Sequence, residues 1–185
     1  MGIYLLPLLL GFIFNLASAF TATFSRRWGE QRGSLATFIL RNILGIPVWA
    51  LGYALAFGTP SSWLWPPRPL TQVLGWIFLA GGGLIIGAAL LAIRARAAKP
   101  SARDSLVQEG LYARVRHPIH SGMFLELVGL FLLRPTRAVT LACAVGIVWV
   151  FIQTRFEEFD LLQRLPDYRP YMARVPRFLP RLRAR

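Results

Sequence analysis

Long apolar runs separated by short basic segments constrain this chain more than any other feature of its sequence. A helix needs about 20 mostly apolar residues to cross the roughly 30 Å hydrocarbon core of a membrane. Runs of this kind cover residues 2–24, 35–57, 70–93, 118–133 and 138–154, the fourth being the shortest. They predict an all-α polytopic membrane protein with five transmembrane helices.

One integral-membrane domain is expected over residues 1–185, because no linker or low-complexity tract divides the chain. Three helices would fall in residues 1–93, and a cytoplasmic loop, a helical hairpin and a tail in residues 94–185. The composition agrees, since 55% of the residues are hydrophobic and only 16% are charged, against about 25% charged in soluble proteins. Cys143, the single cysteine, can form no intrachain disulfide.

The basic residues predict the orientation in the membrane. Most of the 21 Lys and Arg residues follow the first and third apolar runs or lie in the tail, and only Arg68, Arg134 and Arg137 fall on the other side. Because cytoplasmic loops are enriched in Lys and Arg, the N-terminus is expected outside and the C-terminus in the cytoplasm. This distribution also accounts for the net charge of +13 without nucleic acid as a partner. The use of Arg in place of Lys suggests a GC-rich prokaryote, and hence its inner membrane.

Two polar clusters are expected to meet at the cytoplasmic edge. Pro118 favours the first position of a helix, which places His117 at the N-cap. Glu157 lies 19 residues after Ala138, or about 28 Å along a helix at 1.5 Å per residue. A four-residue connection makes the last two helices antiparallel neighbours. The Arg116–Pro118 cluster and the Glu157–Glu158 pair should therefore face each other.

Each of these residues alone also allows a structural interpretation. The two glutamates fit either a solvated pair beside arginines or a carboxylate that binds ribose hydroxyls or an ammonium group. His117 alone fits a helix cap better than a catalytic base. Glu126 lies within an apolar run, so it is either a functional residue or the partner in an interhelical hydrogen bond. Its spacing from Gly122 predicts that it faces another helix.

Together, the motifs of residues 106–180 resemble those of the isoprenylcysteine carboxyl methyltransferase and phospholipid methyltransferase superfamily. That pattern has Gly-x-Tyr, Arg-His-Pro-x-Tyr-x-Gly, an apolar hairpin, Glu-Glu, Tyr-x-x-Tyr and a Val-Pro-Arg-like close. The matching residues are Gly110, Tyr112, Arg116, His117, Pro118, Gly122, Glu157, Glu158, Tyr168, Tyr171, Val175, Pro176 and Arg177. Two departures are His120, where tyrosine is usual, and Leu165-Pro166 in place of Phe-Gly.

The resemblance implies methyl transfer from S-adenosylmethionine to a lipid-like substrate that enters from the bilayer. His117 and Glu158 would help to hold the cofactor, and Arg116 and Arg174 would hold its carboxylate or orient the substrate. With Glu126 added, the predicted catalytic set is Arg116, Glu126 and Arg174. The predicted cofactor-binding set is Gly110, Tyr112, His117, Pro118, His120, Gly122, Glu157, Glu158, Tyr168 and Tyr171. No metal centre is predicted, because the sequence shows no metal-ligand spacing.

Two other functions are compatible with the sequence. Membrane sterol reductases have a similar Arg-His-Pro region and bind a nicotinamide cofactor, but they resemble Val-Pro-Tyr-Arg at the close, where this chain has Val-Pro-Arg-Phe. A membrane scaffold or transporter could use Glu126 and the arginines to line a path. The sequence leaves three classes of methyl acceptor open: a prenylated thiol-carboxylate, a phospholipid amine, and a small hydrophobic thiol or carboxylic acid. No feature indicates an oligomeric state.

Overall fold

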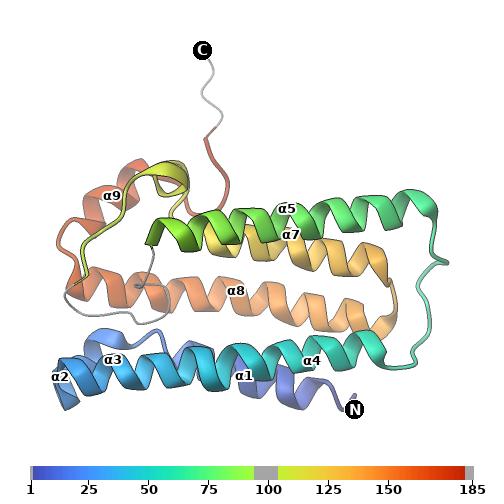
Figure 1. The fold of residues 1–185 in the computed structure, drawn as a ribbon, viewed down its shortest axis with the longest axis horizontal. Coiled ribbons are helices and arrows are strands. Elements are labelled where there is room, and N and C mark those ends of the chain that lie inside the picture. Colours follow the sequence, from blue (N-terminus) through green and yellow to red (C-terminus); the bar gives the residue numbers. More distant parts are fainter. Residues whose placement is uncertain (1, 94–103, 182–185) are drawn as a thin grey trace.

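Helix α8 (Arg137–Arg164) lies between two pairs of helices in the computed structural model, which describes residues 2–93 and 104–181 (Figure 1). One pair is α5 (Pro69–Ile93) with α7 (Pro118–Leu133), and the other is α1 (Leu5–Ala17) with α4 (Ile46–Gly58). The remaining elements are α2 (Thr21–Trp28), α3 (Glu30–Phe38), the π-helical segment η1 (Ile39–Gly45), the 3₁₀ turn η2 (Gly110–Ala113) and α9 (Tyr168–Arg174). The all-α prediction is confirmed for the described residues. Residues 94–103 of the predicted cytoplasmic loop lie outside them.

The helices that qualify as membrane crossings are fewer than the sequence predicts. Three helical stretches of the described chain are long and apolar enough to cross: Glu30–Gly58, Pro69–Ile93 and Arg137–Arg164. The pair of α1 and α2 adds a fourth if it counts as one span, and α7 is a shorter apolar helix of 16 residues. The protein is therefore an integral membrane protein with three or four such helices, and the predicted count of five is not confirmed.

The apolar run over residues 2–24 forms two helices, α1 and α2, because the chain bends by 61° between them. At the bend, the Ser18 hydroxyl donates to the Asn15 carbonyl. The backbone N–H groups of Ala19 and Phe20 donate three residues back, which tightens the last turn and ends the helix. The bend carries α2 to α8, where the Ala22 N–H donates to the Asp160 carboxylate at 2.7 Å.

The second apolar run forms a continuous helical stretch, Glu30–Gly58, with η1 at its centre. A π-helical segment widens one turn of a helix and is common at functional sites. This one ends at Gly45, shortly before Pro47, whose ring nitrogen cannot donate a helical hydrogen bond. The segment contains Arg41 and Asn42, which both line the cavity described below.

Glycines let α5 and α7 approach until their backbones touch. A Cβ atom added at Gly82 would lie 2.6 Å from the Gly122 carbonyl oxygen, and one added at Gly129 would lie 2.8 Å from the Gly75 carbonyl oxygen. Small residues at such positions are the usual means of close helix packing in membranes. Glu126 lies on the same face of α7, because the Cβ added at Gly82 would also lie 2.7 Å from its Cγ atom. The prediction that Glu126 faces another helix is confirmed, and that helix is α5.

At one end of the bundle, the loop between α4 and α5 hydrogen-bonds to the loop between α7 and α8. The Arg137 N–H donates to the Ser62 carbonyl and the Leu64 N–H to the Pro135 carbonyl. The guanidinium of Arg134 lies 5.7 Å from the centre of the Trp63 ring, a cation–π distance. These contacts tie the α4–α5 loop to the start of α8.

Candidate active site

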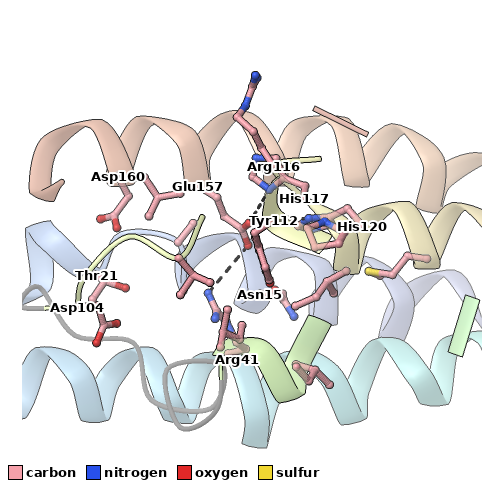
Figure 2. A pocket seen from close by; sticks show the side chains of 18 of the residues that line it. Asn15, Thr21, Arg41, Asp104, Tyr112, Arg116, His117, His120, Glu157 and Asp160 are labelled. Carbon is pink, nitrogen blue, oxygen red and sulfur yellow. Dashed lines mark ion pairs between the residues drawn. The ribbon is translucent and has the colours of Figure 1, made fainter. Parts of the chain in front are cut away.

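A cavity of about 740 Å³ lies at the end of the bundle that carries α2, α9 and the start of α7 (Figure 2). Pockets for small molecules usually measure about 300–1,000 Å³. The predicted site residues that line it are Tyr112, Arg116, His117, Pro118, His120, Glu126, Glu157, Tyr168 and Tyr171. The fold therefore brings most of the predicted set around one space.

The start of α7 supplies the two histidines. Pro118 occupies the first turn of α7 and His117 is its N-cap residue, as predicted. His120 follows one turn later, and its ring centre lies 5.5 Å from that of His117. Both side chains are buried and both line the cavity. Their rings are fixed at the beginning of a helix that is itself packed on α5.

Glu158 lies behind this wall rather than on it. Its buried carboxylate accepts from Arg116 Nη2 at 2.8 Å, from Arg177 Nη2, and contacts His117 Nε2 at 3.2 Å. Glu158 does not line the cavity. Its negative charge offsets two arginines, and its hydrogen bonds fix the orientation of the His117 ring. In this structure Glu158 is a positioning residue.

Glu157, one residue earlier on α8, faces the cavity instead. Its Oε2 atom lies 3.7 Å from His117 Nδ1 and 3.9 Å from His120 Nδ1. Its Oε1 atom accepts from Gln153 Nε2 at 2.9 Å and lies 4.0 Å from Arg41 Nη2. Figure 2 shows Arg41 on the opposite side of Glu157 from the histidines. The predicted meeting of the Arg-His-Pro and Glu-Glu clusters is confirmed, with the two glutamates turned to different sides.

Arg116 joins the site to the tail of the chain. Its Nη1 atom donates to the backbone carbonyls of Met172 and Val175, while Nε and Nη2 donate to Glu158. Its guanidinium is therefore engaged mainly by the protein itself. We infer from these bonds that Arg116 holds the tail and Glu158 in place.

The segment after α9 is extended, as its prolines predict, and runs along the residues before α7. The Arg116 N–H donates to the Pro176 carbonyl at 2.8 Å, and the His117 N–H donates to the Arg177 carbonyl at 3.0 Å. Phe178 then packs edge-on against Phe124 at 5.0 Å between ring centres. These contacts form a strap, residues 175–178, that covers the Glu158 side of the site.

Three tyrosines complete the polar end of the cavity. The Tyr171 hydroxyl donates to the Tyr112 carbonyl at 2.6 Å, which ties α9 to η2. Burial raises the pKa of Tyr171 to about 12, so this hydroxyl keeps its proton at neutral pH. Burial likewise raises the pKa of Tyr168 above its usual range. Within the described ranges, the buried Tyr168 hydroxyl has no hydrogen-bond partner although the residue lines the cavity.

The other predicted site residues lie elsewhere. Arg174 is exposed, and its Nη2 atom donates to Gln108 Oε1 at 3.1 Å. Gly110 starts η2 with a positive φ of 58°, which favours glycine. Gly122 is buried against Ile86 and the Gly82 carbonyl of α5. None of these three lines the cavity.

Several cavity residues come from the N-terminal half, which carries no recognisable motif. They include Asn15, Thr21, Arg41, Asn42 and Trp49. Arg41 lies within the second apolar run, and η1 directs its side chain to Glu157. A π-helical turn leaves no clear sequence signal, so this placement could not be predicted. The one sequence signal for a contribution from this half was the polar Asn15 within an apolar run.

These features define a class of protein: an integral-membrane helical bundle with a buried, polar-ended cavity at one end. The family model for phospholipid methyltransferases matches residues 70–165, which cover α5, α7 and α8. The chain belongs to this family, and so to a superfamily of membrane methyltransferases. No curated protein and no solved structure matches the chain.

Proposed function

We propose that this protein transfers a methyl group from S-adenosylmethionine to a lipid-like acceptor at the cytoplasmic face of the membrane. The observation that carries the proposal is the cavity itself. One space joins buried hydrogen-bonding groups at the end of α8 to apolar side chains on the membrane helices. A polar cofactor and an apolar acceptor can therefore bind next to each other in one cavity.

The polar end fits the chemistry of the cofactor. Glu157 offers a carboxylate that can accept from ribose hydroxyls or from the ammonium group. The Tyr168 hydroxyl, which has no hydrogen-bond partner among the described residues, offers a donor to a bound molecule. Arg41 offers a cation on the same cavity wall. S-adenosylmethionine, when bound, supplies an electrophilic methyl group on a sulfonium.

The apolar end fits an acceptor that comes from the bilayer. Ile46 and Trp49 of α4, with Ile86, Leu90 and Ile93 of α5, line the cavity. Both helices also carry exposed apolar side chains, such as Leu51 and Leu91, suited to contact lipid tails. Since α4 and α5 flank the same cavity, an acceptor could enter sideways between them with its tail still in lipid.

The protein's own contribution is chiefly orientation. Methyl transfer is an in-line displacement, for which correct placement of two reactants is a large part of catalysis. Glu158, Arg116 and the strap hold His117 and the start of α7 in fixed positions. His117 and Glu157 are the groups placed to accept a proton if the acceptor must lose one.

The test is calorimetric titration of S-adenosylmethionine into the detergent-purified full chain. We expect saturable binding that weakens at least about tenfold in Glu157→Gln, since a charged hydrogen bond contributes about 1.5–3 kcal/mol. Glu109→Gln is the matched control, because Glu109 is exposed and lies outside the cavity wall. Equal affinity in all three proteins would contradict the placement of the cofactor, and binding of NADPH instead would favour a reductase.

A further inference from the structure

We propose that His117, His120 and Glu157 form a site for one divalent transition-metal ion, with Zn²⁺ the ion that fits best. One ligand atom from each residue lies within 4.8 Å of the others. Two imidazoles and one carboxylate are a common zinc set in sites that keep a further position open. Metal binding goes beyond methyl transfer and does not depend on it.

The spacing of the ligand atoms suits an ion between them. Glu157 Oε2 lies 3.7 Å from His117 Nδ1 and 3.9 Å from His120 Nδ1, too far for hydrogen bonds. Ligand atoms at about 2.0–2.2 Å from a tetrahedral zinc lie about 3.4 Å apart. Small side-chain movements would therefore bring the three atoms into the coordination sphere.

His117 and Glu157 are each oriented by a hydrogen bond to the side-chain atom that does not face the proposed ion. His117 Nε2 lies 3.2 Å from Glu158 Oε1, so the neutral ring that donates this hydrogen bond has a lone pair on Nδ1. The Nδ1 atom faces the Glu157 carboxylate at 3.7 Å, so a metal ion between them would find one ligand atom on each side. Glu157 Oε1 meanwhile accepts from Gln153 Nε2. Carboxylate–histidine–metal relays of this form are typical outer-shell partners of metal sites.

The surroundings also indicate where the ion's open position would point. All three residues line the cavity, so a fourth ligand would be water or an oxygen or sulfur atom of a bound molecule. Arg41 is the one charge that opposes a cation among the described contacts of Glu157, and it lies 4.0 Å from Oε1, the oxygen not turned to the imidazoles. Imidazole donors favour zinc over Mg²⁺ or Ca²⁺, which prefer all-oxygen sites.

The experiment uses the full chain, purified in detergent, freed of metal by a chelator and titrated with Co²⁺ and then Zn²⁺ without S-adenosylmethionine. We expect visible absorption typical of low-coordinate Co²⁺, saturating at one ion per chain and displaced by Zn²⁺. Glu157→Gln and His120→Phe should abolish saturable binding, and Glu158→Gln should weaken it about 10–100-fold as an outer-shell change. Glu109→Gln should bind like the wild type.

Absence of saturable Co²⁺ and Zn²⁺ binding by the wild type would overturn the proposal, as would unchanged binding in Glu157→Gln and His120→Phe. The wild-type titration tests the metal site by itself, even if one variant fails to fold. Because no cofactor is present, a negative result here with normal S-adenosylmethionine binding would reject the metal site alone.

Discussion

At the scale of single residues, the adjacent glutamates of α8 show how one helical step separates two roles. Glu158 is surrounded by Arg116, His117 and Arg177, whereas Glu157 faces the cavity. Neighbouring residues of a helix with 3.6 residues per turn point about 100° apart, so two adjacent glutamates face different sides. It could not predict which glutamate would face which side, because the strap that supplies Arg177 returns from a distant part of the chain.

Removal of the Glu158 charge is expected to destabilise the protein. Glu158→Gln would leave Arg116 and Arg177 without their anion, and loss of one partner from a buried ion pair costs about 3–5 kcal/mol. For a chain of this size, 3 kcal/mol corresponds to a fall in Tm of roughly 6–12 °C. Thermal unfolding in detergent measures this change, with Glu109→Gln as the control. A Tm equal to that of the wild type would show that the ion pairs do not support the fold.

Tyr168→Phe is expected to weaken binding of S-adenosylmethionine without lowering the stability of the fold. The Tyr168 hydroxyl has no partner within the described ranges, so its removal should leave the Tm of the ligand-free protein unchanged or slightly higher. If this hydroxyl donates to the bound cofactor, the Kd for S-adenosylmethionine should rise about fivefold, as for one hydrogen bond of about 1 kcal/mol. Calorimetry measures both the wild type and the variant. An unchanged Kd would remove Tyr168 from the cofactor site.

At the scale of elements, the contact of α5 with α7 fixes the position of the histidines. Gly82 meets the Gly122 carbonyl where any side chain would collide, whereas a Cβ atom at Gly81 would meet nothing within 4 Å. Three consecutive glycines on α5 allow a close approach, but the sequence does not show which of them makes the contact. That choice depends on how α5 is rotated about its axis against α7.

The two neighbouring glycines therefore offer a matched pair of substitutions. Gly82→Ala should force α5 and α7 apart and destabilise the protein by about 1–3 kcal/mol, as overpacking usually does. Gly81→Ala should be neutral or stabilising by up to about 1 kcal/mol, because alanine is the better helix former. Thermal unfolding of both variants gives the comparison. Equal effects would mean that the helices do not pack through Gly82.

At the scale of the whole molecule, the expected orientation places the cavity at the cytoplasmic face. Cys143 is the single cysteine and is buried, so a Cys143→Ala background allows one reporter cysteine at a time. Gln31→Cys and Ser62→Cys introduce exposed positions at opposite ends of the Glu30–Gly58 stretch. With intact cells, an impermeant maleimide should label only Ser62→Cys. Labelling of Gln31→Cys alone would reverse the orientation.

The sequence predicted the helical class and the convergence of two motifs because both depend on local patterns and helix lengths. It failed where long-range packing decides the outcome. The contact of Arg41 with Glu157 and the position of Arg174 outside the cavity depend on contacts between distant segments. The bend at Ser18 has local hydrogen bonds, but the apolar run around it does not indicate a bend. The cluster of His117, His120 and Glu157 was likewise not visible in the sequence, because the histidines lie at the start of α7 and the glutamate lies on α8.

The central claim is methyl transfer to a lipid-like acceptor, and transfer of labelled methyl from S-adenosylmethionine into an apolar extract tests it most directly. Membranes that contain the wild-type protein should label a component of the lipid phase, and membranes that contain Glu157→Gln should not. Glu109→Gln membranes should match the wild type. Absence of label in the lipid phase, from a protein shown to bind S-adenosylmethionine, would contradict the proposed acceptor class.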